Sequence, residues 1–542
     1  MGLLPFIDRS AGARTLGLTV GTAALLLGLA MAAAGAWAAD QPPKRVIVPL
    51  GTAEDLPVAV TTVQLVGELP AGVAVPEVSA LLQESRSITR MSDLRELALR
   101  IEKLVQAKGY PFFYVLLPDQ EIFNGRVRLL AVNGKIDRVV RIEGGNRRVS
   151  DDRLQDYFRD LIESGGFKRA DFERTMLMIN ELPATNARLI LGPGSAPGLI
   201  DAKLNVDQGP LMRWSVNLNN HGAESTGRER LTTNLKLNDI SGIGDRLSVT
   251  VSKTSRDLTA GVLEYRVPLG IKGLSAQVTT LRSGFGVDAG LNSLGIKGNT
   301  RSTEIALSYP LVLRFDRRLT VEGSTTRRAS ENEIEMLDPM RKSIQVQRLG
   351  LRGSAPDPLG GTTSVRLVLS SGQVSPLTGY SDLSPRGFRL LAFDASRSQS
   401  LSPTTSVHLS VSGQRTTDML DGSEQMSFGG ASAVRAYGGA TLFADQGNLY
   451  RAELMQVLSP DLAGLGRLRA FVFYDRGVAF LDPVVGARTT IAGAGLGVSL
   501  MRWTFYEVRG TYAQRLGSTQ SVGTPGDRDP GGQFWLNVLA FF

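Results

Sequence analysis

One stretch near the end of the chain combines a single cation with glycines and apolar residues. Residues 424–439 contain four glycines, and Arg435 is flanked there by the apolar residues Val434 and Tyr437. Glycine lacks a Cβ and bends the backbone where other residues cannot, so we predict a loop. A loop that merely connected two strands would not need apolar residues on both sides of one arginine. We therefore expect it to fold inward and to place Arg435 beside a carboxylate.

The candidate partner of Arg435 is Asp475, further along the chain. Asp475 is a charge within the otherwise apolar, strand-like run of residues 471–477. If both groups face a lumen shielded from water, breaking the pair would leave one charge uncompensated, at a cost of several kcal/mol. The alternative is that the arginine and the aspartate lie in two separate solvated turns.

The glycine-rich stretch resembles the Val-Arg-Gly-Tyr/Phe motif of outer-membrane two-partner secretion transporters, the TpsB type of the ShlB/FhaC/HecB haemolysin secretion/activation family. There the motif lies in the sixth extracellular loop, which reaches back into a β-barrel. The resemblance implies a lock between this loop and the lumen, formed by Arg435, Asp475, Val434, Tyr437 and Gly438. The chain has Ala436 where that family usually has glycine, so the loop tip is expected to differ slightly.

Composition argues against several other kinds of chemistry. The chain has no cysteine, which excludes disulfides and thiolate metal sites, and only two histidines, His221 and His408. We expect both histidines to be structural or solvated, because neither belongs to a recognisable catalytic motif. We therefore predict no enzymatic activity, no metal and no cofactor. The net charge of +8 comes from lysines and arginines spread among acids, so nucleic-acid binding is not expected.

Three glycines alternate at positions 493, 495 and 497. No helix is predicted after them, so a phosphate-binding loop is not expected. Glycines on one face of a strand leave room for something packed against that face. We expect the inserted loop to occupy this room.

Residues 1–39 have the pattern of a secretory signal peptide. Arg9 and Arg14 precede an apolar core at 16–34, and Ala36 and Ala38 occupy the expected cleavage positions. The alternative is a permanent membrane anchor, because the apolar run is almost long enough to span a bilayer. If the chain is in a membrane, its later segments must span it as a barrel, since they contain no long apolar run.

Residues 40–56 read as a proline-rich linker. Many two-partner transporters carry a plug helix at this place. The segment is too short and too rich in proline to hold both such a helix and its tether. Either the plug is missing or the signal peptide ends elsewhere.

Two similar α/β units are predicted after the linker. Residues 57–134 contain strands and a helix. Leu94, Leu97 and Ile101 recur at helical spacing and form the apolar face of that helix. Residues 135–209 repeat the order β-α-α-β-β. This order is that of a POTRA domain, so the resemblance implies two POTRA domains, the number usual for two-partner transporters.

Residues 210–542 lose the helical period and alternate every second residue. In residues 231–237, leucine and threonine at odd positions alternate with polar residues at even positions. This is the pattern of a transmembrane β-barrel, although a soluble sandwich would alternate in the same way. The sixteen strand candidates begin near Met212, Glu229, Arg246, Thr259, Leu274, Arg301, Leu319, Ile344, Thr363, Phe388, Thr405, Leu449, Leu468, Thr490, Phe505 and Phe534.

The position of the glycine-rich stretch agrees with that strand count. It follows the eleventh candidate, which is where the sixth outer loop of a sixteen-stranded barrel belongs. The predicted fold class is thus α+β periplasmic POTRA domains followed by a sixteen-stranded antiparallel transmembrane β-barrel.

The chain ends in an apolar strand without a polar tail. Phe534, Trp535 and Phe542 belong to this strand, which resembles the targeting signal of outer-membrane barrels. The alternative is the buried last strand of a soluble domain, although chain ends normally fray in water.

These features predict an outer-membrane translocator with its POTRA domains in the periplasm. The POTRA domains would bind an unfolded secreted partner, and the barrel would export it. The resemblance implies a β-helical client such as an adhesin or haemolysin, and a transporter that is a monomer in outer-membrane lipid. The alternative is an outer-membrane insertase, which uses the same parts but usually more POTRA domains. A passive solute pore is a third possibility, although it would need no periplasmic domains.

Overall fold

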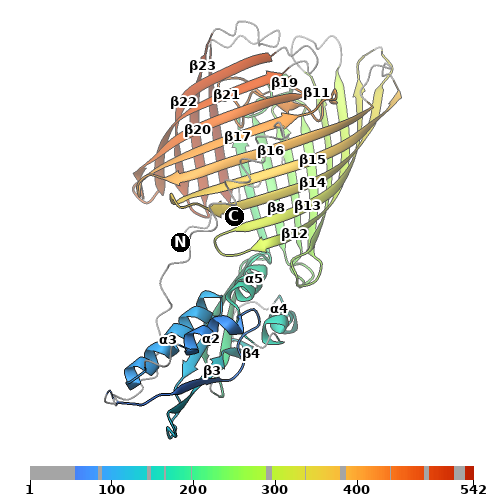
Figure 1. Ribbon diagram of the computed structural model, residues 1–542. Coiled ribbons are helices and arrows are strands. Elements are labelled where there is room, and N and C mark those ends of the chain that lie inside the picture. Colours follow the sequence, from blue (N-terminus) through green and yellow to red (C-terminus); the bar gives the residue numbers. More distant parts are fainter. Residues whose placement is uncertain are drawn as a thin grey trace.

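Two small α/β units lie next to one large barrel in the computed structural model of the chain (Figure 1). The structure describes residues 55, 57–83, 88–142, 148–163, 166–196, 198–287, 296–335, 337–378, 386–439, 441–480, 488–517 and 531–542. The predicted signal peptide of residues 1–39 lies outside this part of the chain. So does the predicted linker of residues 40–56, apart from Asp55.

The first α/β unit packs two helices on a three-stranded sheet. Its elements in chain order are β1 (Thr62–Val66), α2 (Val75–Gln83), α3 (Met91–Ala107), β2 (Phe113–Leu116) and β3 (Arg126–Asn133). Strand β3 is central, parallel to β1 and antiparallel to β2. Leu94, Leu97 and Ile101 recur at helical spacing on α3 and are buried in the core of the unit.

The second α/β unit repeats this arrangement. Its elements are β4 (Lys135–Arg141), α4 (Asp151–Glu163), α5 (Arg169–Asn180), β5 (Thr185–Pro193) and β6 (Leu199–Gln208). Strand β6 is central, parallel to β4 and antiparallel to β5. The core includes Leu154 and Phe158 of α4 and Ile179 of α5. Both units therefore follow the order β-α-α-β-β.

Helix α5 attaches the second unit to the near end of the barrel (Figure 1). Arg174 donates hydrogen bonds to the carbonyl oxygens of Pro310 and Lys272, each over 3.1 Å. Arg318 forms an ion pair of 2.5 Å with Glu181, the residue that caps α5 at its C-terminal end. These contacts fix the unit against the end of the barrel, at one connecting turn and at the ends of two strands.

Among the described residues, sixteen strands form one closed barrel in which every neighbouring pair is antiparallel. The strands are β7 (Met212–Asn219), β8 (Arg230–Asn238), β9 (Arg246–Thr254), β10 (Thr259–Pro268), β11 (Ser275–Gly286), β12 (Lys297–Leu313), β13 (Arg318–Glu333), β14 (Met340–Pro356), β15 (Gly361–Thr378), β16 (Gly387–Ser400), β17 (Thr405–Arg415), β20 (Gln446–Ser459), β21 (Arg467–Phe480), β22 (Arg488–Arg502), β23 (Tyr506–Leu516) and β24 (Gly532–Phe541).

The predicted fold class is confirmed. The expected strand starts differ from the observed ones by at most four residues, as for Arg301 against Lys297 and Ile344 against Met340. Closure of the barrel, rather than pairing of two sheets, rules out the sandwich alternative. No helix of the described residues has the length and apolarity needed to cross a bilayer.

The barrel closes between its first and last strands. Residues 215–219 of β7 pair with residues 537–541 of β24. The Asn217 side chain donates to that of Asn537 over 2.9 Å, and the ring of Phe542 stacks on Trp214 with centroids 4.0 Å apart. The last residue of the chain is thus fixed at the junction.

Changing Arg174 to alanine is expected to loosen the second unit from the barrel. The loss of the two hydrogen bonds from a charged donor should cost about 2 kcal/mol of docking free energy. Hydrogen exchange of the turn amides at 269–274 should accelerate, because Ile271 packs against the core of that unit. Arg169→Ala on the same helix is the matched control, since its side chain pairs with Glu173 within α5. Equal exchange in the two variants would contradict the docking role.

Candidate functional site

The segment between β17 and β20 folds into the barrel. Residues 416–445 contain a short hairpin of β18 (Met426–Ser427) and β19 (Phe443–Ala444). Its apolar side chains are buried against the inner wall, and the cluster comprises Met426, Phe428, Ala433, Val434, Ala436, Tyr437, Leu442 and Ala444 with Leu449, Phe471, Phe473, Ala479, Ile491 and Ala513. We call residues 416–445 the lumen loop. It crosses the bore instead of extending into solvent.

Glycines of the wall make room for the lumen loop. A Cβ at Gly447 would lie 2.2 Å from the Phe428 ring, and one at Gly477 would lie 3.0 Å from the same ring. A Cβ at Gly493 would lie 2.4 Å from the Cβ of Ala436. The methyl group at position 436 is therefore accommodated because residue 493 has no side chain.

Only the first of the three alternating glycines of β22 faces the loop. A Cβ at Gly495 would lie 2.6 Å from the Phe473 ring, and one at Gly497 would lie 2.2 Å from the Phe471 ring. The expectation that the loop fills all of this space is wrong for positions 495 and 497. There the room is taken by aromatic rings of the neighbouring strand β21.

Arg435 at the loop tip lies against Asp475 of β21. Its Nε and Nη2 donate to the two carboxylate oxygens over 2.8 and 2.9 Å, and its backbone N–H donates to Oδ2 over 3.1 Å. Its Nη1 donates to Glu453 of β20 over 2.7 Å, and its guanidinium lies 3.4 Å from the centroid of the Phe473 ring. The Asp475 side chain is fully buried. The guanidinium therefore has two carboxylates as ion-pair partners and an aromatic ring against its face.

Glu453 joins Arg435 to a second arginine of the wall. Arg509 of β23 donates through Nη2 to both oxygens of Glu453 over 3.0 Å. Its guanidinium lies over the Phe471 ring at 3.9 Å. Two cations thus face two carboxylates, which offsets the cost of removing four charges from water. Neither Glu453 nor Arg509 has a sequence signal that would have singled it out.

The loop backbone beside Arg435 is also held. Trp535 of β24 donates its indole N–H to the Arg435 carbonyl over 2.7 Å, and Arg515 of β23 donates to the Ala436 carbonyl over 3.2 Å. The Arg515 guanidinium lies 4.7 Å from the ring centroid of Tyr437. The carbonyl of Gly438 accepts from the Thr441 hydroxyl over 2.8 Å within the loop.

The three aromatic residues predicted as a targeting strand do not share one environment. Trp535 is buried in the lumen, whereas the side chains of Phe534 and Phe542 are exposed. No pattern in the sequence indicates that Trp535 contacts the loop. Alternation along β24 explains the result, because positions 534 and 535 face opposite sides of the wall.

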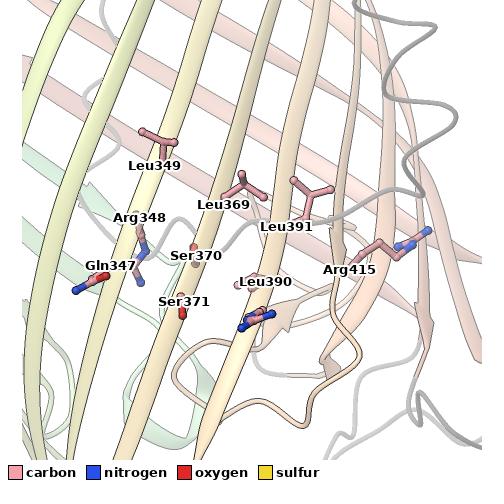
Figure 2. Close-up of a pocket in the computed structure, with 10 residues that line it drawn as sticks. Gln347, Arg348, Leu349, Leu369, Ser370, Ser371, Leu390, Leu391 and Arg415 are labelled. Atoms are coloured by element: carbon pink, nitrogen blue, oxygen red, sulfur yellow. The ribbon is translucent and has the colours of Figure 1, made fainter.

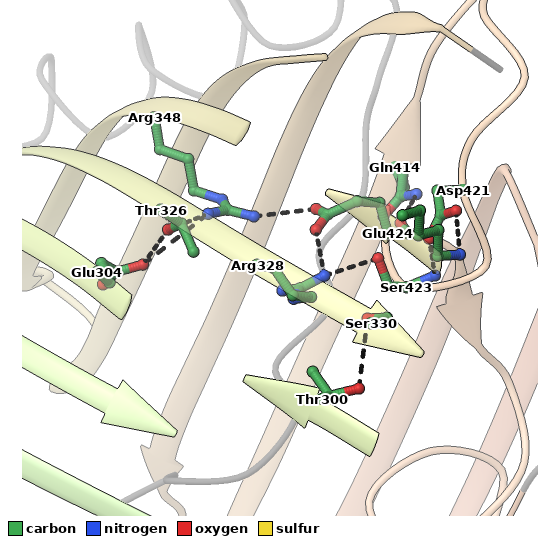
Figure 3. A network of polar contacts seen from close by, with 11 residues as sticks. Thr300, Glu304, Thr326, Arg328, Ser330, Arg348, Gln414, Asp421, Ser423 and Glu424 are labelled. Atoms are coloured by element: carbon green, nitrogen blue, oxygen red, sulfur yellow. Dashed lines mark hydrogen bonds and ion pairs between the residues drawn. The ribbon is translucent and has the colours of Figure 1, made fainter. Parts of the chain in front are cut away.

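The start of the lumen loop is attached to a different part of the wall. Glu424 forms ion pairs of 3.0 Å with Arg328 of β13 and with Arg348 of β14. Figure 3 shows Glu424 between Arg328 and Arg348, with Asp421 close by. Asp421 pairs with Lys342 of β14 over 2.5 Å. Strands β15, β16 and β17 separate these ion pairs from Glu453 on β20.

An apolar contact supports this second attachment. Leu420 is buried in a cluster on the inner wall that also contains Ile344, Val346, Val374, Phe388 and Leu390. Glu424 is the first residue of the glycine-rich stretch 424–439, but no sequence pattern predicts its partners on β13 and β14. We call the contacts of Leu420, Asp421 and Glu424 the β13–β14 anchor and those of Arg435 the β20–β24 anchor.

The two histidines belong to different surroundings, and only His221 lies beside the β20–β24 anchor. His221 is held against Trp535 with ring centroids 5.6 Å apart. Burial, with a smaller contribution from Arg230, lowers the pKa of the His221 imidazole to about 4. The ring is therefore neutral at physiological pH. His408 faces the lumen and shares a hydrogen bond of 3.0 Å with Ser398.

Replacing Arg435 with alanine is expected to release the loop tip. The buried Asp475 would then lack its cation, a loss of about 3 kcal/mol or more and hence a roughly hundredfold shift of the loop equilibrium. Because the chain has no cysteine, Ala433→Cys supplies a single buried thiol whose rate of maleimide modification measures release. Arg476→Ala, one residue beyond Asp475 and exposed, should leave the rate unchanged. Equal rates in the two variants would contradict the anchoring role.

Adding a methyl group at position 493 is expected to push against the loop. Gly493→Ala should destabilise the seated loop by about 1–3 kcal/mol through overpacking. The additional change Ala436→Gly should restore most of the loss, because the two Cβ atoms would otherwise overlap. The thermal unfolding midpoint of the barrel measures both effects. Gly323→Ala is the control, since a Cβ there meets nothing within 4 Å. A failure of Ala436→Gly to rescue would refute this account.

Sequence comparison gives a consistent family. The model of the family described as haemolysin secretion/activation protein ShlB/FhaC/HecB matches residues 198–500, more than half of the chain. The heme/hemopexin transporter protein HuxB of Haemophilus influenzae strain 86-028NP is 23% identical over 513 residues, covering 90% of this chain and 88% of HuxB. The outer membrane transporter CdiB of Dickeya dadantii is 23% identical over 381 residues, 64% of this chain and 63% of that protein.

Solved structures show the same fold. CdiB from Escherichia coli superposes with a TM-score of 0.76 at 19% identity, covering 96% of this chain and 97% of that chain. BamA from Haemophilus ducreyi lacking POTRA domains 1–3 gives a TM-score of 0.51 at 13% identity, covering 90% and 100%. The predicted family and the predicted location in the outer membrane are confirmed. The chain belongs to the ShlB/FhaC/HecB haemolysin secretion/activation family and is an outer-membrane transporter of two-partner secretion.

Proposed function

We propose that the two α/β units capture the unfolded client and that the barrel then exports it past the lumen loop. In this proposal residues 57–134 and 135–209 are POTRA domains 1 and 2, and residues 210–542 are the translocating barrel. Residues 1–39 would be removed as a signal peptide, leaving residues 40–56 as a linker. The repeated order β-α-α-β-β supports the two assignments.

Capture by strand addition is supported by the open edges of the two sheets. Strands β1 and β2 are the edges of the first sheet, and β4 and β5 are those of the second. An extended client segment can pair with such an edge through backbone hydrogen bonds, while alternate side chains enter pockets. Tyr114 and Leu116 on β2 and Ile190 on β5 are exposed apolar side chains at these edges.

The observation that carries the proposal is the double attachment of the lumen loop. Charge pairs hold the loop at the β20–β24 anchor and again at the β13–β14 anchor. Such pairs can open and re-form without any covalent change. A polypeptide that passes through the bore needs space that the loop occupies, so export requires the loop to shift. We assign a lock to Arg435, Asp475, Val434, Tyr437 and Gly438. This lock brings the lumen loop back to its seated position after export.

Family membership supports a proposal for the class of client. The matching family is described as haemolysin secretion/activation proteins, which supports a secreted client. HuxB is named as a heme/hemopexin transporter protein. We propose a large β-helical client of the adhesin or haemolysin kind, whose folding outside the cell drives export without a nucleotide or another cofactor. The transporter would act as a monomer in lipid, without catalysis.

The exposed aromatic residues at the chain end support a role in barrel assembly. Phe534 and Phe542 face outward, where an assembly factor or lipid can reach them. Trp535 faces inward and contacts the Arg435 backbone. We therefore assign the targeting signal to the outward face of β24 and assign Trp535 to the loop as well.

Arg435→Ala is expected to reduce the amount of client in the medium by at least tenfold while the barrel still assembles, because an unlocked loop no longer returns to one position. Immunoblotting of medium and of heat-modifiable barrel in the membrane gives both quantities. Arg476→Ala should export normally. Undiminished export by Arg435→Ala would reject the lock.

Depletion distinguishes secretion from insertase activity, the alternative raised by the BamA-like fold. Loss of one secreted protein after depletion supports two-partner secretion. General loss of outer-membrane barrels would support the insertase instead.

A further inference from the structure

On the outer surface of strands β13–β16, a row of apolar side chains is followed by a row of polar ones. Cross-strand partners Leu349, Leu369 and Leu391 form an apolar row that faces away from the lumen. The next outward row contains Gln347 and Ser371, again direct partners. In Figure 2 the three leucines lie side by side on adjacent strands, with these polar residues beside them. The hydrocarbon zone therefore ends between the two rows.

The polar side of this boundary faces the cell exterior. The chain enters the barrel from the second POTRA domain at Met212, so odd-numbered barrel strands run outward and even-numbered strands run inward. Strand β14 is the eighth in the barrel and begins at Met340. Gln347 therefore lies nearer the exterior than Leu349, at the level of the outer-leaflet headgroups.

Two adjoining pockets follow the boundary. One, of about 600 Å³, is lined by residues of both rows, including Leu349, Leu369, Ser371 and Arg389 (Figure 2). The other, of about 440 Å³, is lined by Arg327, Ser343, Gln345, Gln373, Ser375 and Leu377. Amide and hydroxyl groups thus lie between Arg327 and Arg389, on the exterior side of the exposed leucines.

These two arginines differ from those inside the barrel. Arg328 and Arg348 face the lumen and pair with Glu424. Arg327 and Arg389 point outward and are exposed, and within the described residues their guanidinium groups have no carboxylate partner. The backbone N–H of Arg389 donates to Asp418 over 2.6 Å, but its side chain does not. A cation at the edge of hydrocarbon is costly unless an anion meets it.

We propose that this surface binds a phosphorylated glycolipid of the outer leaflet. We call it the outer patch, which comprises Arg327, Gln345, Gln347, Ser371, Gln373, Arg389, Leu349, Leu369 and Leu391. Each guanidinium takes one phosphate in a bidentate contact. The amides and hydroxyls between them contact sugar hydroxyls, and the leucine row contacts acyl chains.

The spacing of the arginines selects the class of lipid. Arg327 is on β13 and Arg389 is on β16, three strand spacings apart, or about 14 Å across the sheet. One phosphate cannot contact both guanidinium groups over this span. A headgroup with two phosphates on a disaccharide can, whereas a glycerophospholipid carries only one. The geometry thus favours a diphosphorylated glycolipid over a phospholipid.

Native mass spectrometry of the full-length transporter in detergent tests this site, with diphosphorylated lipid A as the probe and phosphatidylglycerol as the competing class. The wild type should bind lipid A more tightly than phosphatidylglycerol. The double variant R327Q/R389Q should weaken lipid A binding about tenfold or more, because it loses two charge-assisted contacts. The variant R327K/R389K keeps the charges and should retain most of the binding.

The matched control is R126Q/R188Q, which removes two exposed arginines of the POTRA domains and should leave lipid binding unchanged. Retention of the heat-modifiable barrel in every variant shows that the fold is intact. Equal lipid A binding by R327Q/R389Q and wild type would overturn the proposal, as would binding of phosphatidylglycerol as tight as that of lipid A. A loss of equal size in R126Q/R188Q would also overturn it, since the effect would then be one of net charge.

Discussion

A guanidinium removed from water must find carboxylates, and the organisation of the lumen follows from this requirement. Arg435 is almost fully buried and meets Asp475 and Glu453, with the Phe473 ring beneath its plane. Each of these groups comes from a wall strand, so the arginine is satisfied only when the loop is seated. Loss of either partner would leave a charge in a site that water reaches poorly, which makes the seated position well defined.

The wall is built to receive this loop. Glycines at 447, 477 and 493 leave space where the loop approaches, and larger side chains surround them. The β13–β14 anchor then holds the beginning of the same loop through Glu424 and Asp421. Movement of the whole loop must therefore break ion pairs with β13 and β14 and also with β21.

The same strands carry a different arrangement on their outer face. Because successive residues of a strand face opposite sides, Arg327 and Arg328 are neighbours in sequence but belong to different environments. The inner arginine pairs with Glu424, whereas the outer one is exposed and is the proposed contact of a lipid phosphate. Strands β13–β16 therefore carry contacts to the lumen loop on their inner face and the proposed lipid site on their outer face.

The amino-acid sequence by itself determined the class of fold. Alternation with a period of two, helical spacing in Leu94, Leu97 and Ile101, and the glycine-rich run at 424–439 are local patterns, so they are legible without coordinates. They also singled out Arg435 and Asp475, with the family motif as a guide. The partners Glu453, Arg509, Trp535 and Glu424 carry no such pattern. Only closure of the barrel brings strands distant in sequence around one lumen, and only the tertiary structure therefore decided which of their polar side chains face the loop and which face lipid.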